Sequence, residues 1–331
     1  MSCPLPVERG PMALVDRPLP ELFEYRASLA EPADFDTFWQ NTIHQARSAA
    51  TSPSLTAEPS WRGVEVSDLR YSGFDGQPIA AWLLRPLGAE GDVPTVVGFN
   101  GYGGGRGLPH EHLAWISAGY AYVFMDTRGQ GGWWGAGGET PDPVGHGASS
   151  PGFATRGLED PEQYYYRRVI TDAVRLVDTV RELPGFDPVA VTGVSQGGGL
   201  AIAVAGLVDG LRAVLPDVPF GCHWRYSVEH SDEDPYAEVR RYLSVHTDRV
   251  EQVFTTLSYV DAVSFAARAT APALFSVGLM DSVCLPTTVF AAHNAWAGPA
   301  RIEAYPFGDH GGGGPRHFLR QVAFLDEVMA R

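Results

Sequence analysis

The 331-residue sequence contains no lysine, so all 24 of its basic residues are arginines. This absence excludes mechanisms that need a lysine amine, such as a Schiff base, a Walker-type phosphate site or a Ser-Lys dyad. The 39 acidic residues outnumber the basic ones and give a net charge of −15. A charge of that sign argues against binding to nucleic acid or to an anionic membrane surface, so we predict neither as a partner.

Cysteine is also scarce, and long apolar runs are missing. The three cysteines, Cys3, Cys222 and Cys284, are too few and too scattered for a disulfide framework or a zinc site. No stretch reaches the roughly 18 apolar residues that a membrane span needs. Residues 1–10 lack the basic segment and apolar run of a signal peptide. We therefore expect a soluble, cytoplasmic protein without a metal site.

What the chain does contain is an alternation of strand-like and helix-like segments. The segments that favour strands are 63–71, 78–85, 95–99, 120–125, 189–192, 212–215, 272–277 and 301–305. The helix-like segments are 110–118, 160–183, 200–207, 286–296 and 316–329. The first two strands flank a Phe74-Asp75-Gly76 turn and are predicted to form a hairpin. The alternation predicts an α/β fold with a mainly parallel sheet covered by helices on both faces.

Two further segments extend this single predicted domain, 1–331. Residues 1–60 form an N-terminal extension, in which Asp34 is the expected N-cap of a helix. That helix would turn Phe35, Phe38 and Trp39 toward the main body. A more charged insertion covers about 216–270, with helix-like parts near 235–243 and 250–257.

The strongest chemical signal is Gly193-Val194-Ser195-Gln196-Gly197. It lies between a β-rich run and a helical run, which is the sequence context of a nucleophile elbow. In such an elbow a serine sits on a tight turn with its hydroxyl exposed above a sheet. The glycines are needed because the turn brings neighbouring backbone too close for side chains. We predict that Ser195 is a catalytic nucleophile.

A serine nucleophile needs a base, and His310 is the best candidate. It lies just past the last strand in a glycine-rich loop that has no apolar periodicity to bury it. The other nine histidines are weaker candidates, because they precede the elbow, lie in the insertion or lie on helices. The order nucleophile, acid, base along the chain is that of the hydrolases.

The base in turn needs a carboxylate, and two positions compete for this role. Asp281 follows the strand 272–277 at the expected functional edge of the sheet, and we favour it. Asp217 follows the preceding strand and is the alternative. Asp309 adjoins His310 in the sequence, and neighbouring side chains rarely orient each other in this way.

An oxyanion hole requires two backbone N–H groups aimed at the charge that develops on the carbonyl oxygen. We expect one from Gln196, the residue after the nucleophile. The other should come from the glycine-rich loop 101–107, with Tyr102 as the donor. This loop does not spell G-x-G-x-x-G at a strand-to-helix junction, so we do not interpret it as a nucleotide cradle.

These motifs together resemble those of the acetyl xylan esterase / cephalosporin C deacetylase family of carbohydrate esterases. The resemblance covers nearly the full length of the chain. It rests on Asp16–Leu22, Pro32–Asp36, the R-G-Q-G motif at Arg128–Gly131, the G-x-S-Q-G motif at Gly193–Gly197, and the acid-bearing strand end Ser276–Asp281. Two differences stand out: Gly311 follows the histidine where the family usually has Glu, and Asn100 occupies a position where His is common.

The resemblance implies an α/β-hydrolase fold with Ser195, Asp281 and His310 as the catalytic triad. It also implies Tyr102 and Gln196 as oxyanion donors. Arg128 and Gln130 would be structural supports around the site. No cofactor would be needed, and a ring-like homo-hexamer would face its active sites toward an inner cavity. The implied reaction is deacetylation of small acetylated sugars and related acetyl esters.

We therefore predict ester hydrolysis through an acetyl-serine intermediate. Four aromatic residues are candidate pocket walls, although they fit an ordinary core equally well: Trp133, Trp134, Phe220 and Trp224. One alternative is a serine peptidase or a general short-chain esterase on the same fold. Another is a non-catalytic binding protein that has kept the fold.

Overall fold

The computed structural model describes residues 16–59, 61–144 and 152–329. Residues 1–15 of the predicted N-terminal extension, and with them Cys3, lie outside this range. Within the described residues, no helix combines the length and the apolar character that a membrane crossing requires.

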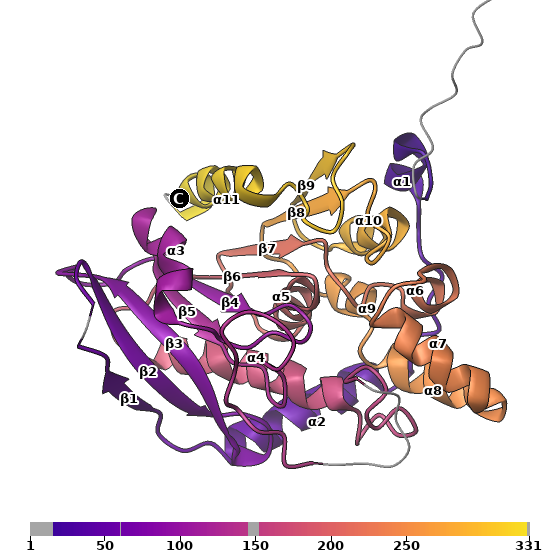
Figure 1. Ribbon diagram of the computed structural model, residues 1–331, viewed down its shortest axis with the longest axis horizontal. Helices are drawn as coiled ribbons and strands as arrows, with labels where there is room; N and C mark the ends of the chain where they lie inside the picture. Colours follow the sequence, from indigo (N-terminus) through magenta and orange to yellow (C-terminus); the bar gives the residue numbers. More distant parts are fainter. Residues whose placement is uncertain (1–15, 60, 145–151, 330–331) are drawn as a thin grey trace, which may run out of the picture.

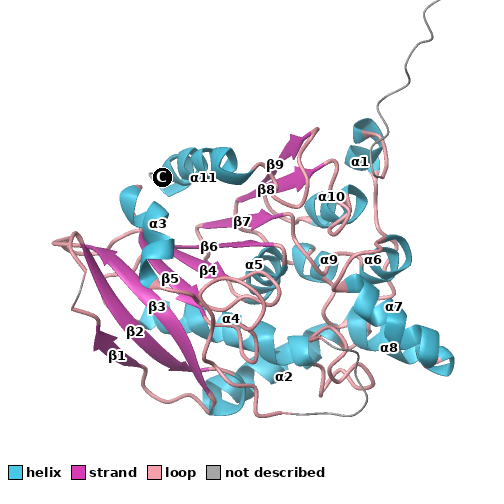
Figure 2. Ribbon diagram, in the orientation of Figure 1, coloured by secondary structure: helices cyan, strands magenta, loops and turns pink. Residues whose placement is uncertain are grey.

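The strands form one nine-stranded sheet, which Figure 2 shows between layers of helices. Its strand order is β1-β2-β3-β5-β4-β6-β7-β8-β9. Strands β1 to β3 are antiparallel, β3 pairs antiparallel with β5, and every pair from β5 to β9 is parallel. The strands are β1 Ser54–Ala57, β2 Val64–Ser72, β3 Pro78–Pro86, β4 Thr95–Phe99, β5 Ala121–Met125, β6 Val189–Val194, β7 Ala213–Asp217, β8 Ala273–Gly278 and β9 Ala300–Tyr305. The predicted hairpin and the mainly parallel sheet are both confirmed, and β1 was missed.

Helices cover both faces of the sheet, as the sequence predicts. The helices are α1 Leu19–Glu24, α2 Phe35–Ser48, α3 Leu113–Ser117, α4 Tyr165–Glu182, α5 Gln196–Leu207, α6 Trp224–His230, α7 Tyr236–Val245, α8 Val250–Ser258, α9 Ala262–Ala266, α10 Pro286–Ala295 and α11 Gly314–Met329. Helices α3 and α11 lie together on one side of the sheet (Figure 1). Helices α6 to α9 fill the predicted insertion, which begins after Asp217.

Successive residues of the central strands enter different cores, because side chains of a strand alternate between its two faces. Val97 of β4 and Val191 of β6 face the larger core, which is built with α4, α5, α9 and α10. Val96 and Ala190, their neighbours in sequence, face the smaller core under α3 and α11. The central parallel strands β4 and β6 are buried on both faces, which explains their nearly continuous apolar sequences.

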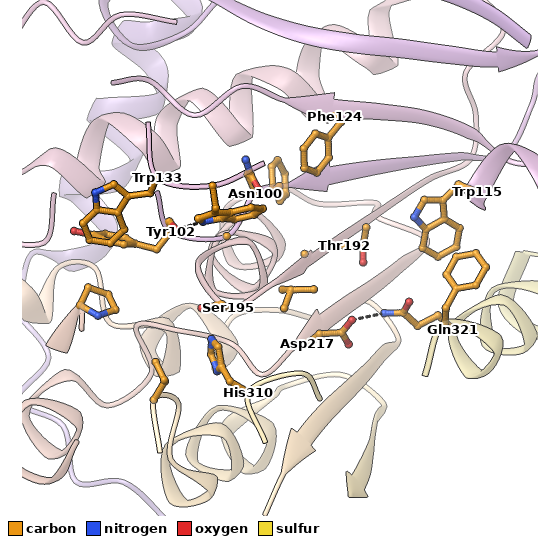
Figure 3. A pocket seen from close by; sticks show the side chains of 18 of the residues that line it. Asn100, Tyr102, Trp115, Phe124, Trp133, Thr192, Ser195, Asp217, His310 and Gln321 are labelled. Atoms are coloured by element: carbon orange, nitrogen blue, oxygen red, sulfur yellow. Dashed lines mark hydrogen bonds between the residues drawn. The ribbon is translucent and has the colours of Figure 1, made fainter. Parts of the chain in front are cut away.

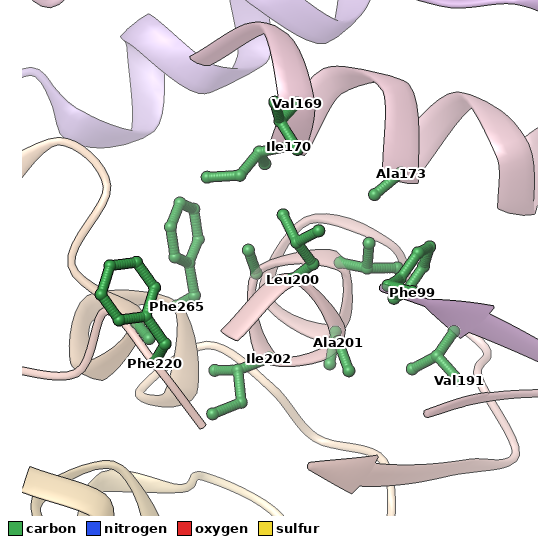
Figure 4. Packing of buried hydrophobic residues seen from close by; sticks show 14 of the residues in the cluster. Phe99, Val169, Ile170, Ala173, Val191, Leu200, Ala201, Ile202, Phe220 and Phe265 are labelled. Atoms are coloured by element: carbon green, nitrogen blue, oxygen red, sulfur yellow. The ribbon is translucent and has the colours of Figure 1, made fainter. Parts of the chain in front are cut away.

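Helix α5, which follows the nucleophile motif, lies at the centre of the larger core. Figure 4 shows it enclosed by side chains from several elements, among them Ile170 of α4, Val191 of β6 and Phe265 of α9. Leu200, Ala201 and Ile202 of α5 are no more than 2% exposed. A helix packed in this way gives the preceding turn a rigid base.

One local prediction needs correction, and another is confirmed in position but not in its hydrogen bond. The helix predicted to begin at Asp160 begins at Tyr165, because the backbone of Tyr164 is extended, with ψ 136°, and Tyr165 N–H donates a 3.0 Å hydrogen bond to Arg156 O. Asp34 does occupy the N-cap position of α2, but its side chain makes no capping bond. Its Oδ1 instead accepts a hydrogen bond of 2.7 Å from the Tyr259 hydroxyl, which ties the extension to the end of α8.

Candidate active site

Ser195 occupies the turn between β6 and α5, and its backbone conformation is one that residues other than glycine rarely adopt. Its φ is 57° and its ψ is −117°. Such strain in a residue other than glycine persists only where the surroundings impose it, and it clusters at functional sites. A Cβ on Gly193 would collide with the backbone of Gly197, and one on Gly197 would collide with Phe99 O. Both glycines are therefore required by the close approach that the sequence predicts.

His310 and Asp281 come together at the same edge of the sheet. Asp281 follows β8 and His310 follows β9, and His310 Nδ1 lies 2.9 Å from Asp281 Oδ2. The other oxygen, Oδ1, accepts hydrogen bonds from the backbone N–H groups of Val283 at 2.8 Å and Cys284 at 3.0 Å. The Asp281 side chain is fully buried, and the His310 ring lies beside Ser195 (Figure 3).

The competing acid, Asp217, has different partners. Its Oδ2 accepts a hydrogen bond of 2.8 Å from Gln321 Nε2 of α11, and its Oδ1 lies 3.0 Å from His317 Nε2 of the same helix. Its backbone oxygen accepts a 2.9 Å hydrogen bond from Ser195 N–H, so this residue supports the turn through its main chain. The structure thus pairs the predicted base with Asp281 and not with Asp217.

The two predicted oxyanion donors are connected by one side chain, Gln130. Gln130 Oε1 accepts a 2.7 Å hydrogen bond from Gly103 N–H, and Gln130 Nε2 donates one of 2.8 Å to Gln196 Oε1. Gln196 is the first residue of α5, so the helix itself cannot satisfy its backbone N–H. Gln130 therefore connects the loop that carries Tyr102 to the residue after Ser195.

Arg128, the other expected support, lies in a buried ion pair. Its Nε and Nη2 donate to the two oxygens of Asp172 at 2.6 and 2.7 Å. The exposed fractions of the two side chains are 0% and 1%. Because Asp172 also accepts a hydrogen bond of 2.8 Å from Phe74 N–H, the pair joins α4 to the turn of the β2–β3 hairpin.

We expect Arg128→Met to lower the free energy of unfolding by about 3–5 kcal/mol, because it leaves the Asp172 carboxylate buried without its partner. Urea unfolding at neutral pH measures this loss. The matched control is Arg301→Met, which removes an exposed pair with Glu327 and should cost less than about 1 kcal/mol. Similar losses in the two variants would contradict a supporting role for Arg128.

A cavity of about 540 Å³ opens beside Ser195 and His310. Its far end lies between α3 and α11 and is polar at Asp217 and Gln321 (Figure 3). The aromatic side chains around that end are Trp115, Tyr122, Phe124 and Phe318. Cavities of this size, mostly apolar with a few polar groups, are typical of small-molecule sites.

The predicted pocket walls divide into two pairs. Trp133 and Trp134 line the cavity and are 61% and 52% exposed. Phe220 and Trp224 are buried in the larger core and do not line it, so the core alternative holds for them. Trp115 was missed because it lies in a short apolar helical segment that looks like an ordinary core face.

Comparisons with known proteins agree on one family. The model of the family described as acetyl xylan esterase (AXE1) matches residues 12–328. A curated protein, acetyl esterase Axe7A of Xylanibacter ruminicola, is 28% identical over 84% of this chain. The match spans 63% of that relative's length.

Two solved structures are similar over almost the whole chain. The acetyl xylan esterase of Paenibacillus sp. R4 is 36% identical, with a TM-score of 0.89 over 94% of this chain and 100% of its own. Acetyl xylan esterase 1 of Thermoanaerobacterium sp. JW/SL YS485 is 32% identical, with a TM-score of 0.85 over 95% of this chain and 98% of its own.

Proposed function

The chain belongs to the acetyl xylan esterase family and has the α/β-hydrolase fold, and we propose that it is a serine carboxylesterase that removes acetyl groups from small acetylated sugars. One observation carries the proposal: His310 Nδ1 lies 2.9 Å from Asp281 Oδ2, beside a serine in a strained turn. With Nδ1 directed at the acid, Nε2 is the nitrogen left to accept the serine proton.

The reaction has two similar halves. His310 Nε2 takes the proton of Ser195 Oγ as this oxygen bonds to the acetyl carbonyl carbon, and the N–H groups of Tyr102 and Gln196 stabilise the oxyanion. The bond to the alcohol oxygen then breaks, and His310 returns the proton to the leaving alcohol. Water next adds to the acetyl-serine with His310 again as the base, and acetate leaves as Ser195 recovers its proton.

Acetylated xylo-oligosaccharides are the proposed substrates, together with acetyl esters of similar size such as cephalosporin C. The cavity is far larger than an acetyl group, so it has room for the ring that bears the ester. Trp115 and Phe318 offer flat apolar surfaces to such a ring, and Asp217 offers an acceptor for a hydroxyl. The names of the similar proteins, acetyl esterase and acetyl xylan esterase, support the same class of substrate.

We expect kcat/KM to fall steadily along p-nitrophenyl esters from acetate to octanoate. Ser195 is only 8% exposed and lines the cavity, which we propose holds the alcohol part of the substrate, so a longer acyl chain would compete with that part for the same space. The control series keeps the acetyl group and changes the alcohol from p-nitrophenol to xylose, and activity should persist. A preference for butyrate or longer would instead indicate a general esterase, and faster cleavage of aminoacyl-amides would indicate a peptidase.

A homo-hexamer and a cytoplasmic location complete the proposal. The exposed Trp133 and Trp134 at the cavity, and Phe307, which is 76% exposed, support an assembly that covers apolar surface. Light scattering of the purified protein measures the subunit number, and fractionation of the producing cells measures the location.

A further inference from the structure

Glu238 of α7 is a buried carboxylate that the proposed reaction does not use. Its exposed fraction is 0%, although it lies on a helix of the insertion. Its two oxygens accept the hydroxyl proton of Tyr102, at distances of 2.8 Å and 3.0 Å. Glu238 therefore contacts the side chain of the residue whose backbone N–H is proposed for the oxyanion hole.

The direction of this hydrogen bond is fixed by the other partners of the hydroxyl. Tyr102 Oη accepts hydrogen bonds from the backbone N–H groups of Phe153 and, at 3.1 Å, of Ala154. A phenolic oxygen has two lone pairs and one proton. With both lone pairs engaged, the hydroxyl must donate, and Glu238 must accept.

The surroundings of the carboxylate are built to fit it closely. Gly152 packs against both carboxylate oxygens, and a Cβ at that position would collide with them. Ala154 N–H donates a second hydrogen bond to Glu238 Oε2, at 3.3 Å. The Tyr102 hydroxyl and Ala154 N–H both donate to Glu238, so these contacts suit an ionised carboxylate.

We propose that Glu238 is a positioning residue, which holds the Tyr102 side chain and thereby keeps the Tyr102 N–H in place at the oxyanion hole. This inference rests on the proposed function, because it gives the insertion a part in the same reaction. The Tyr102 ring is held at its far end by Glu238 and the 153–154 backbone, and its main chain is held at Gly103 by Gln130. Loss of one anchor leaves the loop free to shift, and oxyanion stabilisation depends on donors within about 2.7–3.1 Å of the oxygen.

The ionisation of Glu238 falls in an accessible pH range. Burial raises the pKa of Glu238 to about 7, and the Tyr102 hydrogen bond opposes this rise. The other charged and titratable groups that act on it or sense its charge are Asp234, just before α7, Arg241 of α7, and Tyr164 and Tyr166 at the start of α4. Because the pKa is raised, the carboxylate is ionised above pH 7 and takes up a proton as the pH falls.

The test variant is Glu238→Gln, assayed with p-nitrophenyl acetate against Glu233→Gln as the matched control. Glu233 is an exposed acid just before the same helix. At pH 8 we expect Glu238→Gln to lower kcat about tenfold with little change in KM, because the lost stabilisation belongs to the transition state. The ratio of wild-type to variant kcat should shrink toward one at pH 5.5, where the wild-type carboxyl is itself protonated. Effects of pH on His310 are shared by the two proteins, so they cancel in this ratio.

A double-variant cycle with Tyr102→Phe separates positioning from general packing. If Glu238 acts through the hydroxyl, Tyr102→Phe should give a similar kcat loss, and the double variant should be no slower than the slower single variant. If Glu238→Gln does not fold, Tyr102→Phe alone tests the inference, and we expect the same loss of kcat from it at pH 8. A kcat within twofold of wild type at pH 8, a ratio that does not change with pH, or additive losses would overturn the inference. A wild-type enzyme without esterase activity would instead overturn the proposed function.

Discussion

Ser195→Ala should lower kcat for p-nitrophenyl acetate by about four orders of magnitude or more. The variant keeps the strained turn, the oxyanion donors and the cavity, but it lacks the oxygen that bonds to the acetyl carbon. Its residual rate over water would come from binding and oxyanion stabilisation alone. The loss should appear in kcat, since alanine removes no contact that the substrate needs for binding.

The measurement requires that the variant is folded, and its control is a substitution at a second serine. Ser195→Ala should show the wild-type circular dichroism spectrum and melting temperature within a few degrees. Ser244→Ala removes an exposed hydroxyl on α7 and should leave kcat unchanged. A Ser195→Ala variant with more than about a hundredth of wild-type activity would place the nucleophile elsewhere.

Asp281→Asn should reduce kcat by about ten-thousand-fold, although it changes a single atom. The Asp281 Oδ1 position receives N–H groups from Val283 and Cys284, so the amide oxygen of asparagine must take this place. The amide nitrogen then faces His310 Nδ1 and donates to it. This selects the wrong tautomer of the imidazole, with the proton on Nε2, and that nitrogen can no longer accept the serine proton.

The control for this variant is the competing acid. Asp217→Asn changes the contacts with Gln321 and His317 but not those of His310, so we expect kcat for p-nitrophenyl acetate within about tenfold of wild type. If Asp217→Asn were the more damaging of the two variants, the assignment of the acid would have to be reversed.

The chemical core of the site could be predicted because it depends on local sequence and chain order. Ser195 lies in a motif whose glycines are required by close backbone contacts, and these requirements are visible in the sequence. Asp281 and His310 each follow a recognisable buried strand, and the carboxyl ends of parallel strands meet at one edge of a sheet. The sequence could therefore bring the three residues together without any knowledge of distances.

The residues that could not be predicted contact partners that lie far from them in the sequence. Glu238 lies in the insertion, 136 positions after Tyr102, and helical periodicity alone marks it only as one more helix residue. Trp115 and Phe318 line the cavity because α3 and α11 meet over the sheet, which no local pattern reveals. Phe220 and Trp224 illustrate the converse, since an aromatic residue near a motif is as often in the core as in a pocket.

The most direct test of the account is reaction of the wild-type protein with a fluorophosphonate, followed by mass spectrometry of its peptides. Such a probe reacts with a serine that is activated by a neighbouring base, and the adduct does not turn over. We predict one phosphonyl group per chain on the peptide that contains Ser195, with esterase activity lost in proportion to labelling. Complete labelling with full activity, or complete inhibition with the label on another residue, would contradict the account.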